Sequence, residues 1–317
     1  MAFINIFPPS EKSSQENIPT VKLAVIGTST SGKTYLLNAI HRLVFGGVTL
    51  KNGLRMGALD AQDTTVKFNE IETNVKLMQK MPLPSTAMKY DFDFRLWYRI
   101  KPAIHIVYHD SVGQILTDID PKRNPSRSEF LKVISQATVV WLLLPMQVDK
   151  NGKYLGISHK DILLAEGYLQ DALQNRTDRS PLAFAILLTK ADVLNNLEQE
   201  ITKQELHTLH SKLKDRFEWL TSNDFISTAA LFPVSTLGFD NAQLVTNDND
   251  ETVAYTLRGN DLKPYNVDKL LLWSLSSACY QSVTASSALQ VDDVVKRELL
   301  NNLQQLEGLI FTLKGGQ

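Results

Sequence analysis

The sequence predicts an α/β protein with a three-layer, mostly parallel sheet, an antiparallel edge strand and a C-terminal helix. Near-continuous apolar runs, which are typical of buried parallel strands, alternate with segments of helical periodicity from position 21 to about 285. Several of the apolar runs end in polar residues, as strands that carry a site at their carboxyl ends do. Helices between the strands would cover both faces of the sheet.

Composition sets the class of protein. The 317 residues are 43% hydrophobic and 21% charged, which is ordinary for a globular protein with a substantial core. A net charge of −1 gives no whole-chain argument for binding nucleic acid or an anionic membrane. The single cysteine, Cys279, excludes an internal disulfide and predicts a reducing, cytoplasmic location. No apolar run is long enough to span a membrane.

Along the chain we expect a flexible leader over 1–20, one domain over 21–285 and a C-terminal helix over 286–317. The domain has insertions at about 46–86 and 240–264. A helical pattern runs from Val66 to Met81 inside the first insertion, and the second reads as a polar loop or a hairpin. Neither end carries a lipidation motif, which predicts no stable membrane anchor.

Apolar runs and helical periodicity predict the individual strands and helices. "KLAVIG", "AIHIVYHD", "TVVWLLLP" and "AFAILLTKAD" read as buried strands. Strict alternation of apolar and charged residues in "MKYDFDFRLWYRI" predicts a half-exposed antiparallel strand at the sheet edge. Helical patterns cover 160–175, 197–220 and 267–282. A narrow 4-3-4-3 seam then suits docking on a partner helix or, as we favour, on the same domain; its residues are Leu299, Leu303, Leu306, Ile310 and Leu313.

A phosphate-binding loop follows the first strand. The stretch "GTSTSGKT" matches G-x-x-x-x-G-K-[ST] in full, with a strand before it and a helix after it. Its glycines let successive N–H groups point at a phosphate, and the helix N-terminus favours the same anion. Lys33 would reach the β- and γ-phosphates and Thr34 would bind Mg²⁺. The nucleotide-binding residues predicted here are Gly27, Thr28, Ser29, Thr30, Ser31, Gly32, Lys33 and Thr34.

A second motif, "DSVGQ", ends the strand "AIHIVYHD". Asp110 can hold the metal through a water, and the Gly113 amide can bond the γ-phosphate. Gln114 stands where a side-chain amide could orient the attacking water, so we assign it and Lys33 as catalytic. Alone, this pattern would be an ordinary Asp-Ser turn, but it follows a phosphate loop at the end of a core strand. His105 and His109 alternate along the same strand and are expected to be packed or cross-strand residues and not metal ligands.

A third and a fourth motif select the base. In "TKAD", the Asp192 carboxylate can accept hydrogen bonds from N1–H and the 2-amino group of guanine, a donor pair that adenine lacks. Thr189 and Lys190 precede it, and the Lys190 stem can lie on the base. In "VST", the backbone amides of Ser235 and Thr236 could receive guanine O6. A helix start capped by Asp would explain "TKAD" alone, but not its place in an ordered set of four motifs.

These four motifs, in this order, resemble the guanine-nucleotide domains of Ras-like small GTPases and of the wider class of translation-factor GTPases. TKAD has Thr where Asn is commonest, and VST replaces the usual Ser-Ala pair. The resemblance implies a P-loop G domain, GTP and GDP as ligands, Mg²⁺, slow hydrolysis and switching through a protein effector or activating partner. It also implies a switch threonine over Mg²⁺; Thr86 is preferred, and Thr64 and Thr65 compete for this role. The longer layout is also reminiscent of GTPases from bacterial multi-protein systems.

Two functions remain open from the sequence. A GTPase switch uses Gln114 for hydrolysis and gains 10³–10⁵ in rate from an arginine supplied by a partner. Arg55 is the one candidate we would name for such an arginine in the same chain. The alternative is a guanine-nucleotide-bound structural or interaction protein that does not turn over, for which Gln114 would have no use. An ATP-dependent kinase or transport ATPase is disfavoured by TKAD.

Overall fold

The structure, a computed structural model, describes residues 18–28, 31–45, 50–58, 73, 91–110, 125–148, 154–176, 180–194, 200–239, 242–246, 252–257, 263–281 and 290–315. The strands are β1 (Thr20–Gly27), β2 (Leu54–Ala58), β3 (Asp91–Tyr98), β4 (Lys101–Asp110), β5 (Val139–Val148), β6 (Tyr154–Ile157), β7 (Leu182–Thr189), β8 (Ile226–Val234), β9 (Ala242–Thr246), β10 (Thr252–Leu257) and β11 (Phe311–Lys314). The helices are α1 (Lys33–Phe45), α3 (Pro125–Ser135), α4 (His159–Gln174), a 3₁₀ turn (Ala191–Leu194), α5 (Glu200–Arg216), α6 (Glu218–Thr221), α7 (Val267–Gln281) and α8 (Asp293–Gln305).

Among the described residues, nine strands form one sheet in the order β11-β8-β7-β5-β1-β4-β3-β2, with β6 paired to β5. The strands from β4 through β1, β5 and β7 to β8 run parallel, and the outer strands are antiparallel. β1 lies between β4 and β5, so both of its edges are hydrogen-bonded. The predicted α/β fold with a mostly parallel sheet is confirmed.

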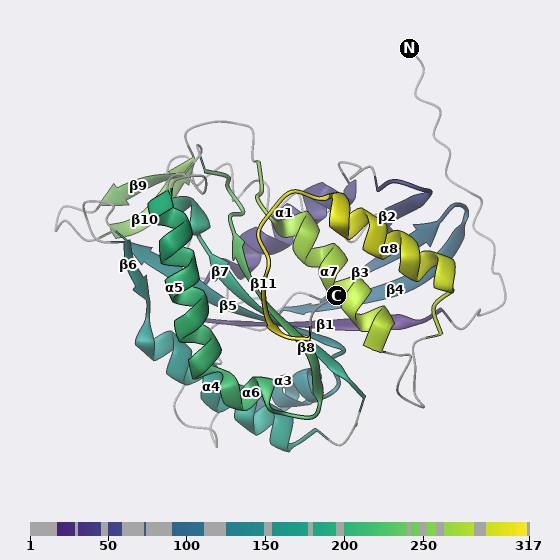
Figure 1. The fold of residues 1–317 in the computed structure, drawn as a ribbon, viewed down its shortest axis with the longest axis horizontal. Coiled ribbons are helices and arrows are strands. Elements are labelled where there is room, and N and C mark those ends of the chain that lie inside the picture. The colour runs from purple at the N-terminus through teal and green to yellow at the C-terminus, as the bar shows by residue number, and fades with distance from the viewer. Residues whose placement is uncertain are drawn as a thin grey trace, which may run out of the picture.

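Side chains alternate between two apolar layers. Val21, Leu23 and Val25 of β1 join the cluster under α1, α7 and α8, whereas Ala24 and Ile26 join the cluster under α3, α4, α5 and α6. Figure 1 shows these two groups of helices on opposite sides of the sheet. Burial of the parallel strands on both faces is why they read as continuous apolar runs. The sheet and the helix layers on its two faces make up the three layers that the sequence predicts.

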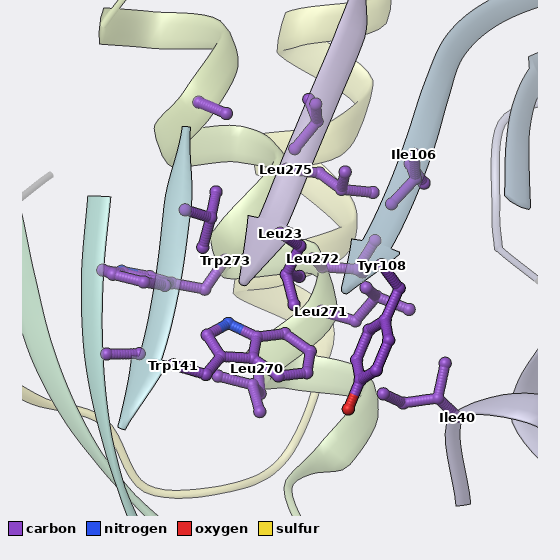
Figure 2. Close-up of a cluster of buried hydrophobic side chains, with 14 of the residues drawn as sticks. Leu23, Ile40, Ile106, Tyr108, Trp141, Leu270, Leu271, Leu272, Trp273 and Leu275 are labelled. Carbon is purple, nitrogen blue, oxygen red and sulfur yellow. The ribbon is translucent and has the colours of Figure 1, made fainter. Parts of the chain in front are cut away.

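Trp141 of β5 belongs to the apolar cluster under α1, α7 and α8. Its ring is fully buried and meets Tyr108 edge to face, with ring centroids 6.1 Å apart. The indole Nε1–H donates to Ser274 Oγ on α7 at 2.8 Å, and that hydroxyl donates in turn to Leu270 O at 2.8 Å. Figure 2 shows both rings against the leucines of α7. The one polar atom of Trp141 is thus satisfied inside an apolar layer.

The alternating pattern correctly predicts the strand β3, but β3 is not an edge strand of the sheet. β2, from the first insertion, pairs antiparallel with its outer side, Arg55 opposite Trp97. Phe92, Phe94 and Leu96 are buried on the α1 side of the sheet. The expectation of an edge strand was wrong because alternation reports a half-exposed face and does not show whether another strand lies alongside.

The C-terminal helix is shorter than its seam predicts. α8 begins at the cap Asp292, whose carboxylate accepts from Val294 N, and ends at Gln305. Leu306 is extended, and Phe311–Lys314 form β11 against β8, so the helix expected over 286–317 was wrong beyond Gln305. Docking on the same domain is confirmed, since Val295 and Leu299 of α8 belong to the core cluster.

α8 also reaches the first insertion. The Asn302 side chain accepts from Lys51 N at 2.7 Å and donates to Lys51 O at 3.3 Å, and Asn52 Nδ2 donates to Glu298 Oε2 at 2.6 Å. These bonds fix the turn that leads into β2. The second insertion forms the hairpin β9–β10, one of the two predicted alternatives.

The leader, except for its last three positions, and the helical pattern over 66–81, except for Thr73, lie outside the described residues. In the part of the chain that the structure describes, no helix is long and apolar enough to span a membrane.

Replacing Ser274 by Ala should lower the free energy of unfolding by about 1–3 kcal/mol, because the buried Trp141 N–H would lose its acceptor. Chemical denaturation measures the change. Ser277→Ala, on a less buried position of the same helix, is the control and should change stability by less than about 0.5 kcal/mol. Equal effects of the two substitutions would contradict the role given to this hydrogen bond.

Candidate nucleotide-binding site

The phosphate loop connects the central strand β1 to α1. β1 ends at Gly27 and α1 begins at Lys33. Ser31 N donates to Thr28 O at 3.1 Å, and Gly32, with a φ of 91°, turns the chain into the helix. Leu36 N then donates to Gly32 O at 2.9 Å, so the first helical turn closes on the loop. Ser29 and Thr30 lie outside the described residues.

Gly27 is needed because other atoms approach its backbone closely. A Cβ at this position would collide with the Ser31 side chain and would lie 3.0 Å from Leu143 Cβ on the neighbouring strand β5. A real Cβ does not tolerate such contacts, so the loop would have to shift. Ser31 itself is fully buried under the loop.

The Lys33 side chain folds back into the loop. It is only 7% exposed, and its Nζ donates to Gly27 O at 2.6 Å and to Thr28 O at 2.8 Å. The predicted catalytic Lys33 is therefore held at the loop, with its ammonium group at the carboxyl end of β1. Thr34, the next residue, is partly exposed at the first turn of α1.

Thr189 joins the base-selecting motif to the phosphate loop. It ends β7, a strand whose residues are all buried, and its Oγ1 donates to Ser31 O at 2.7 Å. Two of the four motifs, more than 150 positions apart in sequence, are thus in direct contact. The Thr189 hydroxyl is therefore the group that links them.

Asp192 is held by the fourth motif. It is 5% exposed, in the 3₁₀ turn after β7, and its Oδ1 accepts from Ser235 Oγ at 2.8 Å. Ser235 is fully buried at the end of β8, the strand next to β7, and its Oγ also accepts from Gly238 N at 2.8 Å. The two predicted base-recognition motifs therefore form one hydrogen-bonded unit.

Burial shapes the charges of this unit. It raises the pKa of the Asp192 carboxyl, and the Ser235 hydrogen bond opposes that rise. Burial also lowers the pKa of Lys190, whereas Asp192 and Asp161 act in the opposite direction. Lys190 adopts a φ of 61°, which turns the chain sharply between β7 and the Asp192 turn. Asp161, in the first turn of α4, was not predicted as part of the site.

Ser235 and Thr236 were predicted to contact guanine O6 through their backbone amides. The Ser235 amide instead donates to Tyr265 O at 3.3 Å, while Tyr265 N donates to Ser235 O at 2.7 Å. In this structure Ser235 contributes its side chain to Asp192, and its amide is engaged within the protein. Thr236 follows at the rim of the loop with partial exposure.

The metal and switch motif is described only in part. Asp110 is the last residue of β4 and lies opposite Val25 of β1, so its backbone comes close to the phosphate loop at the same edge of the sheet. Thr34 offers a hydroxyl oxygen, a type of ligand that Mg²⁺ prefers, whereas the Asp110 side chain lies outside the described part of the chain. Gly113, Gln114 and Thr86, with the competing Thr64 and Thr65, lie outside the described residues.

Arg55 is not brought to the phosphate loop. It lies on β2, three strands from β1 and so about 14 Å away across the sheet. Its guanidinium stacks 5.2 Å from the centroid of the Trp97 ring. The hypothesis of an arginine supplied by Arg55 gains no support from this position.

His105 and His109 of β4 are both partly buried. His105 Nε2 lies 3.5 Å from Asp93 Oδ1 on the neighbouring strand β3. Among the described residues, no group of three or more His, Cys, Asp or Glu side chains is placed to hold a metal ion.

Tyr265 and Asn266 complete the support of the site, and the sequence patterns did not single them out. Asn266 is buried, with a φ of 64°, and its Nδ2 donates to Pro233 O at 3.0 Å just before Ser235. The available signal was local: an Asn directly before a helical pattern is typical of a helix start.

The sequence matches no protein-family model and no curated protein. Solved structures similar to the chain include the GTPase-like domain of Ski7 from S. cerevisiae bound to GTP, and the same domain bound to GDP and inorganic phosphate. The first is 15% identical, covers 82% of this chain and 50% of its own, and has a TM-score of 0.42. The second is 14% identical, covers 69% and 44%, and has a TM-score of 0.39. The chain spans about half the length of these proteins.

Gly27→Ala should lower the free energy of unfolding by about 1–3 kcal/mol, because the new Cβ overlaps Ser31 and crowds Leu143. Gly167, inside α4, is the matched control: nothing lies within 4 Å of its added Cβ. Gly167→Ala should therefore stabilise the protein by about 0.5–1 kcal/mol. Thermal or urea unfolding of both variants checks the pair, and effects of equal sign would refute the crowding at Gly27.

Proposed function

We propose that the protein is a GTP-binding and slowly GTP-hydrolysing molecular switch that acts through nucleotide-dependent binding of a protein partner. The observation that carries this proposal is the buried Asp192 carboxylate, fixed by Ser235 Oγ at 2.8 Å. Such a group can accept hydrogen bonds from guanine N1–H and the 2-amino group. Left unpaired, it would reject adenine, because a buried acceptor without a partner is costly.

The phosphate side of the same ligand would meet the loop and Lys33. The Lys33 ammonium lies at the loop carbonyls of Gly27 and Thr28, so a short movement of its flexible stem would bring it to the β- and γ-phosphates. The Thr189–Ser31 hydrogen bond fixes the distance between this loop and the base-reading turn. One nucleotide would thus be bound at both ends by two segments of the protein that are already in contact through Thr189 and Ser31.

Hydrolysis is assigned to residues of the second motif. Gln114 would orient the attacking water, and the Gly113 amide would bond the γ-phosphate and lose it after cleavage. Mg²⁺, held by Thr34, Thr86 and (through water) Asp110, would neutralise charge on the phosphates. With Arg55 stacked on Trp97, hydrolysis would be slow until a partner protein supplies an arginine. Neither nucleic acid nor a membrane is part of this proposal, and the cytosol is the proposed location.

Asp192→Asn should weaken GDP and GTP binding by at least about a hundredfold and favour xanthine nucleotides, whose C2 carbonyl accepts an amide N–H. Binding of fluorescent GDP, GTP, XDP and ATP to the wild type and the variant measures this change. Asp93→Asn, an exposed carboxylate on β3, is the control and should leave binding unchanged. Equal affinity of the wild type for ATP would contradict the guanine assignment.

Phosphate release in the same samples separates the switch from its alternative. Slow release from GTP that Gln114→Ala abolishes supports the switch. Tight guanine binding without release, even with an excess of candidate activating protein, supports a nucleotide-bound structural protein.

Ser235→Ala should make GDP binding more sensitive to acid. Only the ionised Asp192 carboxylate accepts both guanine hydrogen bonds, and the Ser235 hydroxyl lowers the pKa of that carboxyl. Without the hydroxyl the pKa rises further, so GDP affinity should fall at a higher pH than in the wild type. Titration of GDP affinity against pH measures the shift. An unshifted profile would show that Ser235 does not control this carboxyl, and Asp192→Asn should show no such step.

A further inference from the structure

The segment over 306–315, here called the C-terminal strap, lies against β8, the strand that directly precedes Ser235. Its β11 pairs antiparallel with β8, with Phe311 opposite Leu231, and Figure 1 shows the two strands side by side. The Phe311 ring meets the rings of His207 and His210 on α5 at centroid distances of 5.4 Å and 5.3 Å. The strap is thus anchored along β8, which leads to the hydrogen-bonded pair of Ser235 and Asp192, here called the base-reading unit.

The start of the strap is held by polar side chains from the first turn of α7 and from the two residues before it. Lys269 Nζ donates to Leu306 O at 3.0 Å and to Gly308 O at 2.9 Å. Asn266 Nδ2 donates to Leu309 O at 2.7 Å, and the Tyr265 hydroxyl is hydrogen-bonded to the Leu309 backbone. Gly308 has a φ of 128°, and a Cβ there would collide with Asn266 Oδ1. The strap and Asn266 therefore fit together with no spare space.

The same residues hold the base-reading unit from the other side. The second donor bond of Asn266 Nδ2 goes to Pro233 O, two residues before Ser235. Tyr265 pairs with Ser235 through two backbone hydrogen bonds, and its ring meets Phe239 edge to face at 5.2 Å. Ser235 Oγ then donates to Asp192. An unbroken series of contacts runs from Leu309 through Asn266 and Tyr265 to the base-reading carboxylate.

The helix start does not explain the Asn266 side chain. Its backbone oxygen accepts from Leu270 N at 3.1 Å, which is the helix-opening bond, whereas its side-chain Nδ2 donates to Pro233 O of β8 and to Leu309 O of the strap. A residue with a φ of 64° in this position carries a conformational cost, so its side-chain contacts must hold it there.

We propose that Asn266 is a positioning residue for guanine recognition and that the C-terminal strap, through Asn266 and Tyr265, sets how long a guanine nucleotide stays bound. This inference rests on the proposed function and deepens it. When the strap is attached, Ser235 and Asp192 are held in register with the base. When its contacts are lost, the carboxylate is no longer fixed and the nucleotide dissociates faster.

Inosine diphosphate gives a test that general loosening of the protein would not mimic. IDP lacks the 2-amino group, so it forgoes one of the two hydrogen bonds to Asp192, and the wild type should bind GDP about tenfold to a hundredfold more tightly than IDP. If Asp192 is no longer positioned, the GDP affinity should fall until it is close to the IDP affinity, which abolishes the preference. A merely structural defect should weaken both ligands by the same factor.

Two variants loosen the strap at its contacts with α7. Lys269→Met removes both bonds to the strap carbonyls, and Asn266→Gly removes the side chain while tolerating the positive φ. Each should bring the ratio of IDP to GDP dissociation constants close to one and raise the GDP off-rate about tenfold or more. Lys269→Arg keeps a donor and should restore much of the preference.

Lys314→Met is the matched control, since Lys314 Nζ anchors the far end of the strap to Asn223 O at 2.9 Å, away from Ser235. It should leave the ratio unchanged. An unchanged ratio in Lys269→Met, or an equal loss for GDP and IDP, overturns the proposal even if Asn266→Gly does not fold. A wild-type ratio near one overturns recognition of the 2-amino group by Asp192 and with it this inference. Equal wild-type affinity for GDP and ADP overturns the guanine assignment itself, which distinguishes failure of the proposed function from failure of this inference.

Discussion

The structure depends on the burial of β1 on both faces and along both edges. Val21, Leu23 and Val25 belong to one apolar layer and Ala24 and Ile26 to the other, while β4 and β5 satisfy its backbone on either side. A shift of one residue would exchange the two sets of side chains and would be strongly unfavourable. The register of β1 fixes where Gly27 lies, and hence where the chain can turn into a phosphate loop.

The rest of the site follows from strand order. Because β7 and β8 are parallel neighbours, the turns after them open at the same edge of the sheet and bring Asp192 beside Ser235. β7 is also close enough to the phosphate loop for Thr189 to reach Ser31. The sheet therefore does more than support the site: it fixes the distance between the Asp192 carboxylate and the loop that joins β1 to α1.

Features with strong local signals could be predicted from the sequence. The parallel strands were readable because each is an apolar run, and the phosphate loop because its glycines stand at fixed spacing between a strand and a helix. Asp192 and Ser235 were identified by their order along the chain, and their mutual hydrogen bond followed once both strands were placed. The bond between the Ser235 amide and Tyr265 O could not be predicted from the sequence, since backbone partners leave no local pattern.

Features that depend on distant partners could not be predicted. β2 is a five-residue strand containing Gly57, and it forms because β3 offers an open edge. The leucine spacing beyond Gln305 fits a helix, yet Gly308 must lie against Asn266 and the chain turns into β11. The support given by Asn266 likewise depends on two segments that meet it only in the folded protein.

The pairing of Asn302 with Lys51 has a consequence for synthesis. These residues are separated by 251 positions, so the turn into β2 leaves the ribosome long before the side chain that fixes it. Chains are made N-terminus first, at about 5–20 residues per second, so this turn waits on the order of ten seconds or more for α8. During that interval the apolar positions of β2 and of the α1 layer lack their final cover. The nascent protein therefore has a defined period in which a chaperone, or premature self-association, can act on one particular edge of its sheet.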